Sequence, residues 1–383
     1  QARRKQAGRH EVVIERWAFA RKPAKGRGQS SAEKLRQSRP MTSFLRSDRS
    51  KPIAIWLFVV AALVLAMIVV GGATRLTDSG LSITEWRPVT GAVPPLGEAH
   101  WQAEFAKYRQ IPQYAQINAG MSLEQFKFIY WWEWWHRFLG RLLGLVFAAP
   151  FAVFAIRRQI PRRLFPRLGG IFVLGALQGA VGWWMVASGL VDRVSVAPGP
   201  LTNHLGPAFA LLGLLLWTAF DAWAGAARQT LPSPWGRRAA WLIGLIYLQV
   251  LLGALVAGND AGLVYNDWPM MNGHLVPDDY WAGSLWGTIA HSQGAVQLHH
   301  RIVGYGLALA AVALGVGAWR SSYLSREAKI LGLAAAGGVL AQAALGIATL
   351  MAVSPLGLSI AHQLLAAIVL SLAVAFGWRV RRV

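Results

Sequence analysis

Two stretches of the chain read almost alike: EWWHRFLGRLLGL at residues 133–145 and QLHHRIVGYGLAL at residues 297–309. Each places a His-Arg pair near the start of a long apolar run. The pairs are His136 with Arg137 and His300 with Arg301. A second histidine follows each pair at the start of a later apolar run, as His204 in LTNHLG and as His362 in SIAHQL. The sequence therefore predicts an internal repeat with two such histidines in each copy.

The composition is that of a membrane protein. Of the 383 residues, 55% are hydrophobic and only 14% are charged, whereas a soluble domain averages about 25% charged residues. Cysteine is absent, which excludes disulfides, iron–sulfur clusters and thiolate metal sites. A metal in this protein must therefore be held by histidine, carboxylate or methionine.

The positive charge is concentrated at the amino terminus. The net charge is +21, and residues 1–51 contain 15 Lys and Arg against four acids. Because residues 1–50 are polar and lack apolar periodicity, we expect a basic, disordered cytoplasmic tail. We expect the natural start to be Met41, with residues 1–40 appended. The alternative is an arm that binds nucleic acid or anionic lipid; we expect no nucleic-acid partner.

Eight apolar runs are long enough to cross a bilayer, which takes about 20 residues. Their approximate limits are 53–73, 137–156, 168–190, 205–224, 239–257, 294–318, 329–352 and 358–378. The predicted fold class is thus an all-α integral membrane protein with eight transmembrane helices.

The connections between these runs alternate in charge. Arg and Lys cluster before the first run, after each even-numbered run and at the carboxyl end. Between the runs they include Arg157, Arg158, Arg162, Arg163, Arg167, Arg228, Arg237, Arg238, Arg320, Arg326 and Lys329. The other connections are neutral or acidic. Because cytoplasmic loops carry an excess of Lys and Arg, the pattern places both termini in the cytoplasm.

The repeat extends to the outer loops. The first contains SGLSITEWRPVTGAVPP (residues 79–95) and the second AGLVYNDWPMMNGHLVP (residues 261–277). Gly80, Trp86 and Pro95 of the first match Gly262, Trp268 and Pro277 of the second. Since each copy has four runs, both copies enter the membrane in the same direction, as a parallel repeat. We predict two pseudo-symmetric four-helix bundles, residues 51–228 and 229–383.

The four paired histidines begin even-numbered runs and so lie at similar depth on the outer side. Two helices of one bundle that each offer an imidazole can hold a haem iron from both faces. A single histidine in a membrane more simply hydrogen-bonds a neighbouring helix, but four at matched positions favour ligation. The predicted ligands are His136 and His204 in the first half and His300 and His362 in the second.

Residues beside these histidines fit the same interpretation. Gly140 and Gly304 each come four residues after a histidine, on the same helix face, where a missing side chain lets a flat macrocycle approach. Arg137 and Arg301 are placed to pair with haem propionates. The remaining histidines are expected not to bind metal. They are His10, His100, His274, His291 and His299.

The two copies differ beside the first histidine of each. Glu133 lies three residues before His136, and the matching residue in the second copy is Gln297. A carboxylate at the membrane boundary is costly and marks a functional site by default. We therefore expect Glu133 to be catalytic and the second half to hold a permanent haem. The alternative for Glu133 is a capping role or a salt bridge with Arg137.

These motifs resemble those of haem A synthases of the alphaproteobacterial and mitochondrial type. The resemblance rests on EWWHR, the second histidine of each half and GGATRLTDSGLSITEWRPVTGAVPP (residues 71–95), and it covers about residues 50–380. Members of this family oxidise the ring methyl of haem O to a formyl group, which gives haem A for cytochrome oxidase. The resemblance implies that His300 and His362 bind a haem b, that His136 and His204 bind the substrate haem O, and that Glu133 is essential to turnover.

The same resemblance implies a multi-pass protein of the cell inner membrane. The expected partners are haem O, the lipid bilayer, haem O synthase and a redox partner that the sequence does not name. Two other functions stay open. A non-enzymatic di-haem b membrane electron carrier needs no carboxylate beside one haem, and a duplicated transporter predicts polar residues at mid-membrane rather than at one face.

Deletion of residues 1–40 is expected to leave membrane insertion and activity intact. The tail has no apolar face to pack, and Arg46, Arg49 and Lys51 remain beside the first run to hold the amino terminus inside. Activity per molecule of inserted protein is compared for the full and shortened chains. A large loss at equal insertion would contradict the expectation and give the tail a role such as docking a partner.

Overall fold

The computed structural model describes residues 49–225 and 233–381, which belong to one compact unit of the chain. The predicted tail up to residue 48, including Met41, lies outside the described residues, as does Arg228. Within the described ranges the secondary structure is helical, apart from one isolated bridge between Met271 and His274. The prediction of an all-α protein is confirmed for this part of the chain.

Eight of the described helices are long and apolar enough to cross a membrane, which confirms the prediction of a multi-pass membrane protein. They are α2 (Lys51–Leu76), α5 (Leu123–Ile156), α6 (Phe165–Ala187), α7 (Pro198–Ala224), α8 (Pro234–Gly258), α10 (Gln293–Arg320), α11 (Arg326–Met351) and α12 (Leu356–Val380). The connections contain shorter helices. They are α3 (Glu98–Tyr108), α4 (Pro112–Gln116), α9 (Leu285–Ala290) and the 3-10 turns η2 (Thr90–Ala92) and η3 (Ala261–Leu263).

The second span begins earlier than hydropathy indicates. Helix α5 starts at Leu123 rather than at residue 137, so His136 lies well inside the helix and not at its start. A capping box sets this boundary: the Ser122 hydroxyl accepts from the Gln125 backbone N–H, and the Gln125 side chain accepts from the Ser122 N–H. The prediction of this boundary was wrong because the preceding turns mix polar and aromatic residues.

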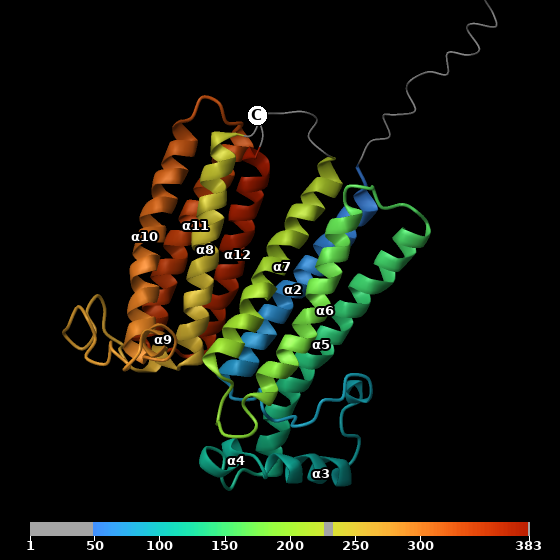
Figure 1. The fold of residues 1–383 in the computed structure, drawn as a ribbon, viewed down its shortest axis with the longest axis vertical. Helices are drawn as coiled ribbons and strands as arrows, with labels where there is room; N and C mark the ends of the chain where they lie inside the picture. The colour runs from blue at the N-terminus through green and yellow to red at the C-terminus, as the bar shows by residue number, and fades with distance from the viewer. Residues whose placement is uncertain (1–48, 226–232, 382–383) are drawn as a thin grey trace, which may run out of the picture. The chain divides into compact units, whose positions relative to one another are not determined.

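The spans pack in two groups (Figure 1). Helices α2, α5, α6 and α7 form the first, and α8, α10, α11 and α12 form the second. The inner helices α2 and α7 also contact α12, and their buried apolar residues, such as Leu57, Leu212 and Leu370, share one core. This arrangement is compatible with the two predicted four-helix bundles.

The two groups differ at one helix pair. Helices α10 and α11 pack closely, since a Cβ added to Gly315 would lie 2.7 Å from the Ala336 Cβ. The matching helices α5 and α6 touch one another much less. Their contacts include Phe151 against Phe165 and Phe172, toward the end of α5 that is remote from His136. The first group is therefore looser than the second along this side.

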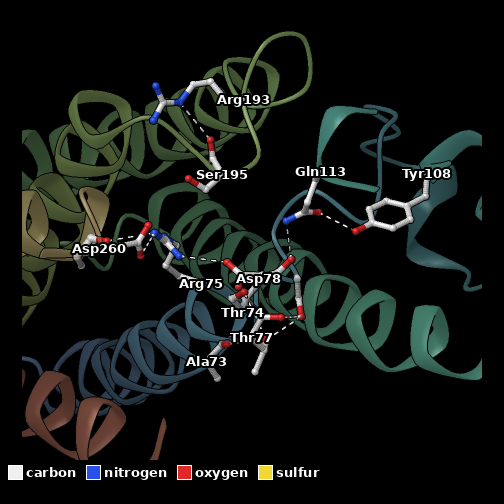
Figure 2. Close-up of polar contacts among 12 residues, drawn as sticks. Ala73, Thr74, Arg75, Thr77, Asp78, Tyr108, Gln113, Arg193, Ser195 and Asp260 are labelled. Atoms are coloured by element: carbon white, nitrogen blue, oxygen red, sulfur yellow. Dashed lines mark hydrogen bonds and ion pairs between the residues drawn. The ribbon is translucent and has the colours of Figure 1, made fainter. Parts of the chain in front are cut away.

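Arg75, in the last turn of α2, joins the two groups at the end that carries the outer loops (Figure 2). Its Nη2 donates to Asp260 Oδ1 at 2.8 Å, and its Nη1 lies 3.4 Å from Asp78 Oδ1. Burial raises the pKa of the Asp78 carboxyl above its ordinary value, and the charge of Arg75 opposes this shift. Gln113 donates to the Asp78 carbonyl and accepts from Tyr108, which attaches the α3–α4 segment to the end of α2.

Candidate functional site

The four predicted histidines occupy equivalent places on α5, α7, α10 and α12. Each imidazole lies against a glycine of the preceding membrane helix, so closely that a methyl group would displace it. A Cβ would lie 2.8 Å from the His136 ring at Gly71, 3.0 Å from His204 at Gly182, 3.2 Å from His300 at Gly253 and 2.7 Å from His362 at Gly346. At Gly71 and Gly346 a side chain would force the ring to move, and at Gly182 and Gly253 the ring would have to give by a few tenths of an ångström. We call each histidine, with the helix residues that face it, a histidine station.

The four stations lie at one depth. Each glycine comes five residues before the last residue of its helix: Gly71 before Leu76, Gly182 before Ala187, Gly253 before Gly258 and Gly346 before Met351. At 1.5 Å per residue, each glycine lies about 7.5 Å from the helix end. The sequence predicted this common depth for the histidines but not the glycines that set it.

Three stations contain a glutamine that the sequence analysis missed. It comes four residues before the glycine, and its Nε2 donates to the backbone carbonyl of the histidine. The distances are 2.9 Å from Gln178 to His204, 3.0 Å from Gln249 to His300 and 2.9 Å from Gln342 to His362. At the His136 station the corresponding residue is Met67. In the sequence, this glutamine and its glycine form the pattern Gln-x-x-x-Gly at three stations, and the fourth station has Met-x-x-x-Gly instead.

Each group of helices contains two of the predicted ligands: His136 on α5 and His204 on α7 in the first, and His300 on α10 and His362 on α12 in the second. That each pair binds one iron stays a prediction. Among residues 49–225 and 233–381, no cluster of three or more His, Cys, Asp or Glu could hold a bare metal ion. A pair of imidazoles instead fits a haem iron, which brings four nitrogens of its own and needs two axial ligands.

The surroundings of the imidazoles also fit a haem. The Nδ1 atoms of His136 and His204 are buried and have no hydrogen-bond partner among the described residues. Gly140 and Gly304, predicted to face the macrocycle, lie at the stations: a Cβ would be 3.4 Å from Met67 Cε at Gly140 and 3.2 Å from Gln249 Nε2 at Gly304. Their role toward a haem stays a prediction.

Glu133 is buried and accepts hydrogen bonds from four donors. Its Oε2 accepts from the Ser82 hydroxyl at 2.8 Å and from the Ile83 N–H at 2.7 Å. Its Oε1 accepts from Arg137, whose Nε lies at 3.0 Å and Nη2 at 2.6 Å. The salt bridge considered as the alternative for Glu133 is therefore present within α5, and the bonds from Ser82 and Ile83 tie the first outer loop to that helix.

Gln297 also contacts the outer loop of its half, but it donates a hydrogen bond to that loop where Glu133 accepts them. Its Nε2 donates to the Ala261 carbonyl at 2.7 Å, and its Oε1 accepts from Arg301 Nη2 at 2.8 Å. The first loop thus offers Glu133 only donors, whereas the second offers Gln297 an acceptor. The exchange of carboxylate for amide between the halves follows from this difference in the loops.

Arg137 and Arg301 hold the outer loops over the stations. Arg137 donates to the carbonyls of Ile83 at 2.7 Å and Glu85 at 2.9 Å. Arg301 donates to the carbonyls of Tyr265 at 3.1 Å and Met270 at 2.8 Å. These contacts give both arginines a structural role, and their pairing with haem propionates stays a prediction.

Glu133→Gln is expected to loosen the first outer loop, because an amide N–H would then face the donors Ser82 and Ile83. Leaving one buried donor unsatisfied costs about 1–3 kcal/mol, which corresponds to a loss of about 5-fold to 160-fold in amide protection. Hydrogen exchange at Ile83 measures the effect. The matched change Gln297→Glu sets a carboxylate against the Ala261 carbonyl and should loosen the second loop instead. Unchanged protection of both loops in both variants would contradict this account.

Known proteins share this sequence over both halves. The family described as cytochrome oxidase assembly protein matches residues 54–374. A heme A synthase of Caulobacter sp. (strain K31) is 60% identical over 342 residues, which cover 89% of this chain and 100% of that relative. The heme A synthase of Caulobacter vibrioides shows the same identity and coverage, and that of Maricaulis maris is 50% identical over 340 residues. The resemblance inferred from the motifs is confirmed, and the chain belongs to the cytochrome oxidase assembly protein family.

Proposed function

We propose that the protein is a haem A synthase, an oxidoreductase that converts the ring methyl of haem O into the formyl group of haem A for cytochrome oxidase. The observation that carries the proposal is the pair of histidine stations in each half, with a buried carboxylate beside only one pair. The relatives named heme A synthase, which match over nearly their whole length, support the same function.

In this proposal the two halves bind different haems. His136 and His204 of the first half, residues 51–228, bind the substrate haem O. His300 and His362 of the second half, residues 229–383, bind a resident haem b. The packing supports this division, because the loose side between α5 and α6 suits a bulky substrate that enters and leaves, whereas the closely packed α10 and α11 suit a permanent group. Helices α5 and α6 are the least buried of the eight spans, and the apolar tail of haem O fits such a surface.

The reaction oxidises one carbon twice. In each step the oxygen comes from water, two protons are released and two electrons pass to the redox partner, so that the methyl group becomes first an alcohol and then a gem-diol. The gem-diol loses water to leave the aldehyde. The haem supplies the redox chemistry when bound; the chain positions the methyl group and handles protons. Glu133, one helical turn before His136, acts as the proton acceptor or orients a water. The Ser82 hydroxyl, which donates to Glu133, offers a path for a proton to the carboxylate.

The protein lies in the cell inner membrane with both termini in the cytoplasm. The charge pattern supports this orientation, because the basic residues at the helix ends lie opposite the histidine stations. The described ones include Arg157, Arg167, Arg237, Arg320 and Arg379. Haem O arrives from haem O synthase, and a separate redox partner takes up the electrons.

Gly346→Ala is expected to weaken binding of haem b by about tenfold or more, because a Cβ there meets the His362 ring at 2.7 Å and a displaced ligand loses affinity. Gly337→Ala is the matched control on the same helix, since a Cβ there meets nothing within 4 Å. Haem b content and the low-spin absorption spectrum of the purified proteins measure the effect. Equal haem b in the two variants would contradict the assignment of His362.

Glu133→Gln is expected to abolish haem A formation while haem b and the fold are retained, since the change removes one carboxylate of the first half and leaves the His300 and His362 stations as they are. Haems extracted from cells that make haem O are separated by chromatography and quantified per molecule of protein. Gln297→Glu disturbs the matching loop contact of the other half and distinguishes loop loosening from loss of the carboxylate. Normal haem A formation by Glu133→Gln would refute the catalytic role of Glu133.

A further inference from the structure

The His136 station differs from the other three in the residue four positions before its glycine. Gln178, Gln249 and Gln342 each donate to the backbone carbonyl of their histidine and so hold one turn of the ligand helix. Met67 has no N–H to donate and is only a weak acceptor. Its methyl group instead lies toward Gly140 on α5. The helix that carries His136 therefore lacks a contact that the other three histidines share.

Two of these glutamines, both in the second half, also lie next to the rings. Gln249 Nε2 is 3.1 Å from His300 Nδ1 and 3.2 Å from His300 Nε2. Gln342 Nε2 is 3.2 Å from His362 Nδ1 and 3.3 Å from His362 Nε2. The Oε1 of each glutamine is buried with no partner among the described residues. Each of these amides thus contacts both the backbone carbonyl and the ring of its histidine. Such partners outside the ligand set restrain the orientation of a metal-binding imidazole.

The turn of α5 that carries His136 lacks this side-chain support. The Nδ1 atoms of both His136 and His204 are buried without a partner in the described part of the chain, so the ring nitrogens do not distinguish these two histidines. The glutamine does, because Gln178 donates to the His204 backbone carbonyl whereas the thioether of Met67 cannot donate to that of His136. His136 is therefore less restrained in orientation than the other three histidines.

We propose that Met67 is a positioning residue that keeps His136 a weak, readily exchanged ligand, so that the first half takes up and releases its haem. The inference rests on the proposed function, because only a substrate site needs to release its haem in every cycle. The step involves ligand exchange alone: the bond from His136 Nε2 to iron forms on entry and breaks on exit, with no change in oxidation state. The loose packing of α5 against α6 provides space for this exchange.

Met67→Gln tests the proposal directly, because methionine and glutamine are similar in length and the change rebuilds the station of the other three histidines. The purified full-length protein is loaded with haem O, and its transfer to excess apomyoglobin is followed by absorbance. We expect transfer to slow by about tenfold or more and the ferric low-spin electron paramagnetic resonance signal of the first half to sharpen. Met67→Leu keeps an apolar side chain of similar size and is expected to keep fast transfer.

Gln249→Met makes the reverse exchange in the second half. We expect haem b, which stays with the native protein, to transfer to apomyoglobin at least about tenfold faster in this variant. Unchanged transfer of haem O in Met67→Gln would overturn the proposal, as would equal slowing in Met67→Leu, which would show a packing effect. Failure of the native protein to take up haem O at all would instead refute the proposed function.

Discussion

The contact between an imidazole and a bare glycine backbone determines how the membrane helices of this protein pair. It occurs four times at one depth, at Gly71, Gly182, Gly253 and Gly346. Hydrophobic burial does not hold helices together in lipid, so close packing and interhelical hydrogen bonds must do so. The same contact fixes the place of each imidazole against the preceding helix. Helix pairing and ligand placement therefore depend on one interaction.

The two halves share this arrangement of histidines and glycines but differ in three local features. The first outer loop presents the Ser82 hydroxyl and the Ile83 N–H, which require a carboxylate at position 133, whereas the second presents the Ala261 carbonyl, which requires an amide at position 297. Met67 replaces a glutamine, and α5 lies loosely against α6. All three differences fall in the same half, which is the half that we assign to the substrate. These differences support our proposal that the two halves hold one reactive and one resident haem site.

Patterns that are local in sequence predicted much of this arrangement. The spans followed from hydropathy, and the four histidines followed from their recurrence at matched places. The start of α5 did not, because it depends on the Ser122–Gln125 capping box and not on hydropathy. The hydrogen bonds of Glu133 to Ser82 and Ile83 could not be predicted either, since they join residues about 50 positions apart through the path of a loop. The glutamines were visible in the sequence, but their meaning required the facing helix.

The division of the halves into a substrate site and a resident site is tested most directly by removing one histidine pair at a time. The variants are His136→Ala with His204→Ala, and His300→Ala with His362→Ala, each purified from cells that make haem O and analysed for the identity of the bound haem. The account predicts that the first variant keeps haem b and loses haem O and haem A, and that the second loses haem b but still binds haem O. Loss of the same haem from both variants would contradict it.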